Sequence, residues 1–317
     1  MSRQDKELRD RWSADSADTA MELLLRGQAE SPFGSYEGRV DMRGLTVEQP
    51  ARTAVGSNLS RIAKIFKFEQ RRIDGVDFSY ASLPEWRVND TRFDNCVFDH
   101  AKLISFRSYS AVFERCTFRS TKLNDAVLGA TSNDRRPGGV FQDCDFSGAD
   151  LRGASTDPGR FVRCDFQASK WKGTRFLSTV LEYCDFRGAS IDGAFFDGRA
   201  FSNNAPVGLG ENKLTGCNFS STALSDTSFM AIDFRNCVPP AGPDFVLIDE
   251  YPRTVQAALD YVRSSAGRDA TIAAAILEPE ASSAKFLPTD ARGLLQLNHY
   301  PGGSRTLITQ AFGVPND

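Results

Sequence analysis

The seven cysteines of this 317-residue chain are the side chains most able to act as metal ligands or nucleophiles. They stand at positions 96, 116, 144, 164, 184, 217 and 237. A zinc site needs closely spaced ligands, yet no Cys-x-x-Cys pair occurs and the only histidines are His100 and His299. We therefore expect no metal site and no cofactor. The cysteines are predicted to be free and buried, in a reducing, cytoplasmic compartment.

Histidines and carboxylates do not assemble a catalytic set in the sequence. His299 lies in the loop-like segment Leu297-Asn298-His299-Tyr300-Pro301. The paired carboxylates Asp249 and Glu250 precede an expected helix, where acidic groups are favoured by the helix dipole. A glycine-rich phosphate loop with its lysine is also missing. The sequence predicts a protein that is not an enzyme.

Regular spacing is the stronger signal. Four of the six intervals between successive cysteines are twenty residues long. Large apolar residues also recur every fifth position, from Phe68 to Leu128, from Phe141 to Phe201 and from Leu214 to Phe234. The residue two positions before each of these centres is usually Ala, Cys, Ser or Thr.

Neither a helix nor a flat strand keeps a strict period of five on one side. A square coil does, if each side takes five residues and points its centre and the preceding small residue inward. Four sides then make a twenty-residue coil, and equivalent residues stack at the ~4.8 Å spacing of parallel strands. Trp86 and Phe106 fill the small-residue position beside the reduced centres Val88 and Ser108, which predicts local repacking at constant volume.

The repeats resemble the pentapeptide-repeat protein family in runs such as Cys144-Asp145-Phe146-Ser147-Gly148 and Ala149-Asp150-Leu151-Arg152-Gly153. The resemblance covers about residues 68–238. It implies a mainly β fold, a right-handed quadrilateral parallel β-helix. The resemblance also implies a possible function, because some members of the family bind type II topoisomerases and protect them from quinolones or natural gyrase poisons.

The segments outside the repeat differ from it in composition. We expect residues 1–67 to form an N-terminal cap with a helix through Thr19–Arg26, capped by Asp15 or Ser16. Residues 68–238 form the β-helix. After the proline-rich break that follows it, residues 244–317 are predicted to be a mostly helical capping or interaction segment. Helices are expected around Thr254–Ser264, Ala270–Leu277, Thr289–Leu297 and Ser304–Phe312.

Two insertions interrupt the repeat, near residues 129–140 and 202–213. Both are expected to leave the coil at the corner between its third and fourth sides, counted from the cysteine side. Because loops on a rigid scaffold often carry specificity, we predict that they bind a partner. A stack of aspartates on the cysteine side is a further candidate, although its simplest role is to bond neighbouring turns. The candidate residues are Asn133, Asp134, Arg135, Arg136, Asn203, Asn204, Glu211, Asp145, Asp165 and Asp185.

The charge balance limits the choice of partner. The whole chain has a net charge of -3, and residues 76–237 hold twenty acidic and nineteen basic residues. A DNA mimic is expected to be decidedly acidic, and a nucleic-acid binder basic. No apolar run is long enough for a membrane helix, and Met1–Trp12 is too charged for a secretory signal.

Two kinds of function fit the sequence. The first is a topoisomerase-binding and -protecting protein, which confers resistance to a gyrase poison. The second is a scaffold or regulatory adaptor that binds an unrelated protein through its loops or C-terminal segment. We expect no direct contact with nucleic acid or membrane, and a homodimer through a terminal segment stays open.

Overall fold

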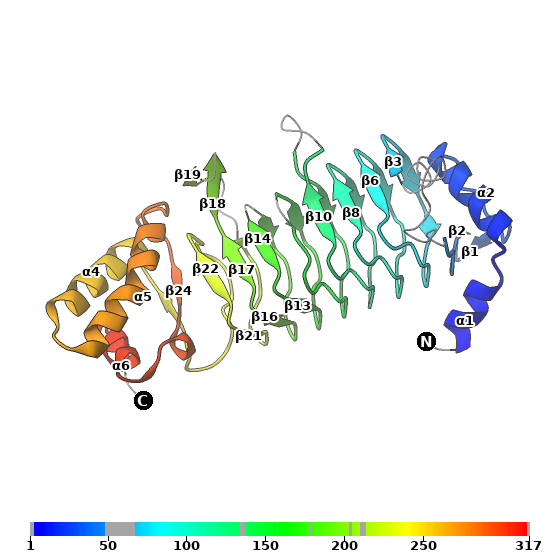
Figure 1. Cartoon of the computed structure of the whole chain (residues 1–317). Helices are drawn as coiled ribbons and strands as arrows, with labels where there is room; N and C mark the ends of the chain where they lie inside the picture. Colours follow the sequence, from blue (N-terminus) through cyan, green and yellow to red (C-terminus); the bar gives the residue numbers. More distant parts are fainter. Residues whose placement is uncertain are drawn as a thin grey trace, which may run out of the picture.

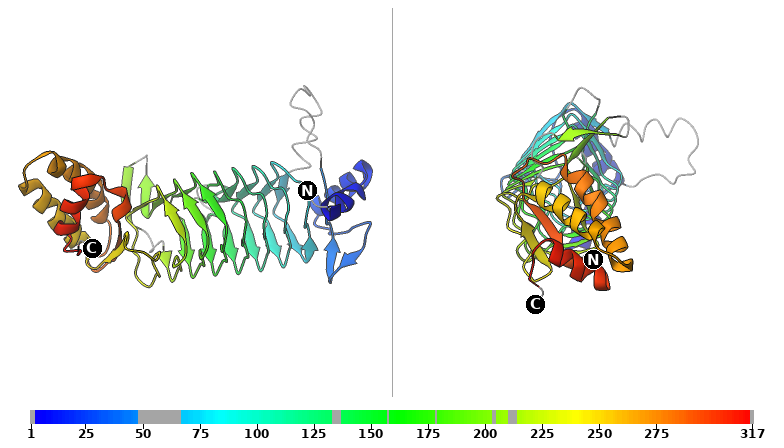
Figure 2. Two further views of the ribbon diagram at one scale, coloured as in Figure 1. Left: turned by 90° about the horizontal axis from the view of Figure 1, so that it is seen from below. Right: turned by 90° about the vertical axis from the view of Figure 1, so that its left-hand side faces the viewer.

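An elongated four-sided coil of short parallel strands forms the middle of the protein, and helices cover both of its ends (Figure 1). The computed structural model describes residues 3–47, 67–132, 137–156, 158–177, 179–202, 205–209 and 214–315. The two termini lie at opposite ends of the rod, which Figure 2 shows from two further directions. The predicted quadrilateral parallel β-helix is confirmed.

The four sides are numbered in chain order from the cysteine side. In one coil they are centred on Phe98, Leu103, Ser108 and Phe113. The fourth side is a seven-stranded parallel sheet. Its strands, in chain order, are β4 (Arg72–Asp74), β7 (Arg92–Asp94), β9 (Val112–Glu114), β11 (Val140–Gln142), β12 (Arg160–Val162), β15 (Val180–Glu182) and β20 (Leu214–Thr215).

The other three sides are less continuous. The third side is built from β3 (Lys67–Glu69), β6 (Arg87–Asn89), β8 (Arg107–Tyr109) and β10 (Val127–Ala130), then from β14 (Arg175–Leu177), β17 (Phe195–Asp197) and β22 (Ser228–Met230). The second side has strands β13 (Lys170–Lys172), β16 (Ser190–Asp192) and β21 (Ala223–Ser225) in its C-terminal half. Single parallel bridges join most coils of the first side, from Asp77 to Val238.

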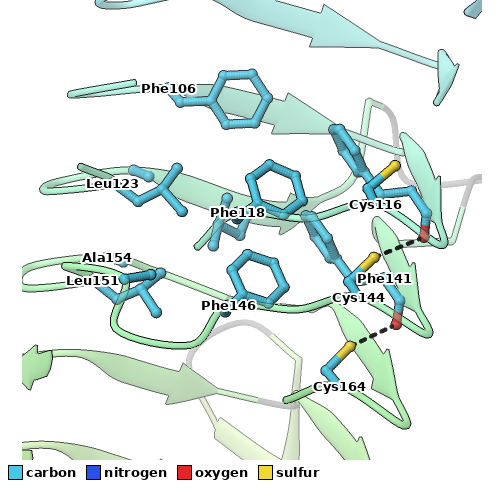
Figure 3. Close-up of a cluster of buried hydrophobic side chains, with 14 of the residues drawn as sticks. Phe106, Cys116, Phe118, Leu123, Phe141, Cys144, Phe146, Leu151, Ala154 and Cys164 are labelled. Atoms are coloured by element: carbon cyan, nitrogen blue, oxygen red, sulfur yellow. Dashed lines mark hydrogen bonds between the residues drawn. The ribbon is translucent and has the colours of Figure 1, made fainter. Parts of the chain in front are cut away.

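Columns of stacked aromatic rings fill the coil. On the first side, the ring centroids of Phe98 and Phe118 are 4.8 Å apart and those of Phe118 and Phe146 are 4.7 Å apart. The fourth side repeats this spacing, with 4.7 Å between Phe113 and Phe141. Figure 3 shows the rings lying over one another in successive coils. Each ring therefore has a large partner above and below, and the interior is dry and dense.

The small position supplies space and, on the first side and in several other coils, a hydrogen-bond donor. Cys144 and Cys164 point their Sγ atoms at carbonyl oxygens of the preceding coil, those of Phe113 and Phe141, at 3.5 and 3.4 Å (Figure 3). Thr174 donates in the same way to the Leu151 carbonyl at 3.1 Å. Cys, Thr and Ser recur here because each is small and can donate to a carbonyl. All seven cysteines are free and buried, as predicted.

The irregular third side is repacked as expected. Trp86 and Phe106 are buried in the small position, while Ser108 occupies the centre and is also fully buried. The ring centroids of Trp86 and Phe106 lie 5.7 Å apart. Large and small side chains have exchanged places within one side.

Most corners of the coil are turned by a residue in the left-handed region. The non-glycine residues with positive φ between Gln70 and Asn236 all lie two positions after a centre, for example His100 (φ 59°) and Arg115 (φ 51°). Such a conformation costs roughly 1 kcal/mol for an ordinary L-residue, and Asn, Asp and Gly relieve it. The corner position is thus the place in the repeat where the backbone conformation is least favourable for an ordinary residue.

The N-terminal end is covered by α1 (Arg3–Asp10) and α2 (Ala14–Leu25). The residue that caps α2 is Ser13, whose side chain accepts a hydrogen bond from the Ser16 backbone, so the predicted cap at Asp15 or Ser16 is wrong. Met21 and Leu24 of α2 join the core of the rod. Strand β2 (Arg39–Asp41) pairs with β1 (Ser35–Tyr36) and with β5 (Val76–Asp77).

A hairpin and three α-helices close the C-terminal end. The hairpin consists of β23 (Phe245–Ile248) and β24 (Gly293–Gln296), and the helices are α4 (Tyr251–Ser264), α5 (Arg268–Ala284) and α6 (Gly302–Ala311), with a short 3-10 turn η1 at Leu297–His299. The helix predicted over Thr289–Leu297 is wrong, since this stretch contains β24 and part of η1. The other three helices are confirmed.

The hairpin lies between two apolar cores. Phe245, Leu247 and Leu294 pack into the core of the rod, whereas Ile248 and Leu295 belong to the core of the three helices. The Gln296 side chain donates to the Thr227 carbonyl at 2.8 Å, which fastens the hairpin to the last coil. The open, apolar end of the β-helix is thereby covered.

Candidate partner-binding surface

Both insertions leave the rod at the corner between the third and fourth sides, as predicted. The first separates β10 of the third side from β11 of the fourth, and the second separates β17 from β20. Phe141 returns to register against Phe113, and Leu214 returns against Leu181. The repeat therefore resumes unchanged after each insertion. The two exits are three coils apart, or about 14 Å.

The first insertion is fastened at its base. Ser110, at the same corner one coil earlier, accepts a hydrogen bond from the Ser132 backbone at 2.9 Å and donates to the Pro137 carbonyl at 2.9 Å. The Ser132 hydroxyl also lies 3.1 Å from a carboxylate oxygen of Asp90. One hydroxyl thus holds both arms of the insertion.

A close backbone approach completes this base. Gly129 has a φ of +93°, and a Cβ there would lie 2.5 Å from the Cα of Gly159 in the following coil. Only glycine fits, because both the conformation and the space exclude a side chain.

The second insertion contains the antiparallel hairpin of β18 (Arg199–Ser202) and β19 (Ala205–Leu209). Asp197, at the end of β17, binds the Arg199 guanidinium at 2.9 and 2.7 Å and fixes the start of this hairpin. The five-residue series placed Phe201 at a fourth-side centre. This is wrong, because Phe201 pairs with Pro206 inside the hairpin and Leu214 takes the place against Leu181.

The tips of the two insertions lie outside the described residues. They include seven of the predicted partner-binding residues: Asn133, Asp134, Arg135, Arg136, Asn203, Asn204 and Glu211. The remaining three, Asp145, Asp165 and Asp185, lie in register on the first side. The structure therefore places these three on a different side of the rod from the corner at which the insertions leave.

The three aspartates bond the turns that follow them. Asp145, Asp165 and Asp185 each accept a hydrogen bond from the backbone N–H two residues later, at 2.8–3.0 Å. Burial disfavours the charged form of Asp145, but hydrogen bonds from Ser147 and Arg119 outweigh it and lower the pKa of that carboxyl. Such bonds hold a carboxylate in register with its neighbours in spite of their repulsion.

The geometry agrees with a comparison against family models. A model described as pentapeptide repeats matches residues 160–198 with eight copies, within the segment where the coils and centres were observed. Residues 160–198 are pentapeptide repeats. A comparison with curated proteins gives no match.

Solved structures of the same repeat resemble the chain at low identity. A trypsin-treated variant of QnrB1, a plasmid-mediated fluoroquinolone resistance protein, is 18% identical, covers 55% of this chain and 79% of its own, and has a TM-score of 0.23. HetL, involved in heterocyst differentiation regulation in the cyanobacterium Nostoc, is 15% identical, covers 55% of this chain and 85% of its own, and has a TM-score of 0.22. Rfr23 from the cyanobacterium Cyanothece is 15% identical, covers 57% of this chain and 97% of its own, and has a TM-score of 0.26. These likenesses carry no argument about function.

Ion pairs between coils neutralise much of the fourth side of this pentapeptide-repeat rod. Arg160 binds Glu182 of the next coil at 2.6 Å, and Arg163 binds Asp143 of the preceding coil at 2.6 Å. Arg92 with Glu114 forms the same kind of pair. Each cation stands near the carboxylate of a neighbouring coil because equivalent positions are stacked. These ion pairs could have been predicted from the sequence, since the paired acidic and basic residues lie about twenty positions apart.

Among the described residues, the other titratable groups do not converge on a reacting centre. His100 stacks on Tyr80 with 4.9 Å between ring centroids, while His299 lies in the C-terminal segment, where partial burial lowers its pKa. Asp249 pairs with Arg292 at 2.5 Å. Within the part of the chain that the structure describes, no group of three His, Cys, Asp or Glu side chains is arranged to hold a metal ion. No described helix is both long and apolar enough to span a membrane.

Sequence reasoning missed a half-buried acid in the C-terminal segment. Glu280 of α5 accepts a hydrogen bond from the Tyr251 hydroxyl at 3.1 Å. Burial raises the pKa of Glu280, and burial together with the nearby Glu280 raises the pKa of Tyr251. Glu280 follows Pro279 and belongs to no sequence pattern, so its contact with Tyr251 could not be predicted from the sequence.

Proposed function

We propose that this protein is a non-enzymatic interaction module, which holds two insertions on one corner of a stiff rod for a protein partner to grip. The observation that supports this most is the exit of both insertions at the same corner, three coils apart. The bonds of Ser110 to both arms of the first insertion add to it. A rod with fixed loops lowers the conformational entropy that binding must remove.

The absence of catalysis is part of the proposal. A β-helix interior filled by stacked phenylalanines leaves no space for a substrate, and catalysis needs convergent groups in a pocket. The buried thiols are consistent with a reducing, cytoplasmic compartment. The homodimer through a terminal segment stays a prediction, which sedimentation velocity of the full chain tests.

Two partner classes follow from the sequence. A type II topoisomerase is the best single named partner, because it is bound by family members that this chain resembles and because two projecting insertions are present. The extensive ion pairing favours the second class, a protein unrelated to DNA. A rod whose carboxylates are paired with arginines offers a poor imitation of a polyphosphate surface. We therefore place the adaptor function first and topoisomerase protection, with its resistance to gyrase poisons, second.

An affinity capture from lysate of the source organism tests the proposal. The bait is the tagged full chain, compared with Arg135→Ala/Arg136→Ala and with a variant whose second insertion is cut to a plain five-residue side. Arg253→Ala/Arg263→Ala, exposed on the C-terminal helices, is the matched control. We expect one partner to be lost with either insertion variant and kept by the control.

The identity of the captured protein then separates the two classes. Gyrase or topoisomerase IV subunits would call for a supercoiling assay with and without drug. Another protein, captured through the insertions, would support the adaptor. If neither insertion variant changed the set of captured proteins, the proposal would be overturned.

A further inference from the structure

The charges of the second and third sides balance over the rod but not along it. Over the seven coils from 81 to 231 these two sides hold eight cations and eight carboxylates, whereas four consecutive coils, at 101–110, 121–130, 149–158 and 169–178, hold seven of the cations and three of the carboxylates. The cations are Lys102, Arg107, Lys122, Arg152, Lys170, Lys172 and Arg175, and the carboxylates are Asp125, Asp150 and Asp157. We call these seven cations the basic strip.

Registration of the coils makes the strip continuous. Parallel bridges join Lys102 to Lys122, Lys122 to Asp150 and Asp150 to Lys170 in successive coils. Five of its cations lie on the second side, and all five are exposed. Arg107 and Arg175 stand across the next corner, on the third side.

Carboxylates meet two of the second-side columns. Asp192 of the following coil pairs with Lys172 at 2.9 Å, and Asp150 stands in register between Lys122 and Lys170 but is withdrawn from the surface. Asp150 is 3% exposed. Its oxygens accept hydrogen bonds from Arg152 at 2.7 Å and from Asn124 at 2.8 Å, and Lys122 lies 3.6 Å away. Arg152 therefore lowers the pKa of Asp150 to about 2 and keeps it ionised. Asp150 serves to anchor two cations of the strip rather than to present negative charge to a partner.

The neighbouring first side has the opposite character. Asp99, Asp145, Asp165 and Asp185 follow it in coils of the same part of the rod, against two cations. Arg119 pairs with Asp145 and Arg187 with Asp185, which leaves an excess of two carboxylates on this side. The basic strip thus has an acidic border along one edge. A ligand that fits it must be narrow and must carry negative charge on one side only.

We infer that the basic strip binds the acidic face of an α-helix belonging to the protein partner, which deepens the interaction function proposed above. Coils repeat every ~4.8 Å. A helix lying along the rod presents a residue of one face every three or four positions, a rise of about 4.5–6 Å. Glutamates on that face therefore meet successive coils. Ile104, 42% exposed beside the lysines, adds an apolar contact at one end of the strip.

Duplex DNA fits the same strip less well. A duplex carries phosphates all around its circumference, so part of its charge would lie against the aspartates of the first side. A helix with one acidic face avoids this repulsion. The acidic border accordingly favours the helix over nucleic acid.

Fluorescence anisotropy with three labelled probes tests the inference on the full chain. The first probe is an 18-residue helical peptide with glutamates at i, i+3, i+4 and i+7, the second has the same composition with glutamates around the whole helix, and the third is a short DNA duplex. We expect the first to bind at least about tenfold more tightly than the others. Its affinity should fall as salt rises, because exposed charges are screened.

Two variants with equal change of charge localise the binding. Lys102→Glu/Lys170→Glu reverses two exposed cations of the strip, and Arg253→Glu/Arg263→Glu reverses two exposed cations of the C-terminal helices. The first should weaken binding of the one-faced peptide by about tenfold or more, and the second by less than about twofold. Matching melting temperatures would establish that both variants are folded.

Three results would overturn the inference: no binding of the one-faced peptide, equal binding of the two peptides, or tighter binding of the duplex. Equal weakening by both variants would overturn it as well. Each of these results leaves the proposed interaction function standing if a partner is still captured through the insertions. Loss of that capture, with peptide binding retained, would instead remove the proposed function and leave an acidic-helix site.

Discussion

The β-helix and the C-terminal segment solve the same problem, the burial of apolar side chains, in opposite ways. In the β-helix the coils repeat one another, so that most phenylalanines meet an equivalent ring twenty residues away, or further along the chain where an insertion intervenes. In the C-terminal segment, helices α4, α5 and α6 surround a core of residues without a period, such as Val255, Leu277 and Ile308. The hairpin of β23 and β24 belongs to both, because alternate residues face each core. The difference teaches that periodic columns tolerate insertions at corners, whereas an aperiodic core depends on each connection.

The largest effect should come from a charge in the middle of a column. We expect Phe166→Asp to unfold the rod or to destabilise it by more than about 4 kcal/mol, since an unpaired carboxylate would replace a ring between Phe146 and Phe186. Circular dichroism melting measures it. Ser190→Asp, exposed on the second side, is the control and should melt close to the unmodified protein. An unchanged melting temperature for Phe166→Asp would break the comparison, because columns would then not carry the stability.

Removal of residues 239–317 should have the next largest effect. It would expose Phe229 and Phe234 and the open strand edge of the last coil, now covered by the hairpin. We expect the shortened rod to self-associate, as measured by light scattering after gel filtration. A stable, monodisperse rod of residues 1–238 would mean that the C-terminal segment is not needed as a cover.

Loss of one donor in the small position should cost less. Thr174→Val keeps the shape of the side chain but removes the hydrogen bond to the Leu151 carbonyl, so we expect a loss of about 1 kcal/mol in the free energy of unfolding. Thr174→Ser keeps the donor and is the matched variant. If denaturant unfolding shows the valine variant to be as stable as the serine one, the small position is selected for size alone.

The smallest effect concerns the pH dependence of the C-terminal segment. The pKa of Glu280 is raised in the folded protein, so this group contributes stability at low pH that is lost as the pH rises from the ordinary glutamate pKa through the raised one. Glu280→Gln keeps an acceptor for Tyr251 and removes the titration. We expect it to raise the melting temperature at pH 8 and to have little effect near pH 4. A stabilisation that is equal at both pH values would contradict buried ionisation as its cause.

The sequence predicts the two regions unequally, for a physical reason. A sequence period is visible when each unit buries the same positions. The burial of Phe98, Phe118 and the seven cysteines could therefore be predicted from the sequence, and so could the exchange of large and small side chains at Trp86. The hairpin could not, because Gly293–Gln296 is too short to separate a strand from a helix by its apolar pattern. Its strand conformation comes from tertiary contacts, with Leu294 facing one core and Leu295 the other.

The candidate site was predictable in part. The corner of exit followed from counting residues, and it is confirmed by the pairing of Phe141 and Leu214. The two bonds of Ser110 to the first insertion could not be foreseen, since they join residues that the repeat does not relate. The pairing of carboxylates with arginines of neighbouring coils was available in the twenty-residue columns, and it sharpens the choice between an acidic mimic and an adaptor.

Equivalence of the coils has a consequence for the gene. Phe141 and Leu214 return to their columns after insertions of different length. The stacking therefore depends on the five-residue sides and not on the number of residues that leave at a corner. An in-frame duplication of about 60 nucleotides, begun at any codon within the regular repeats, would add one complete coil and lengthen the rod by about 4.8 Å. Length can therefore vary in single genetic steps, while both ends and the corner that carries the insertions keep their structure.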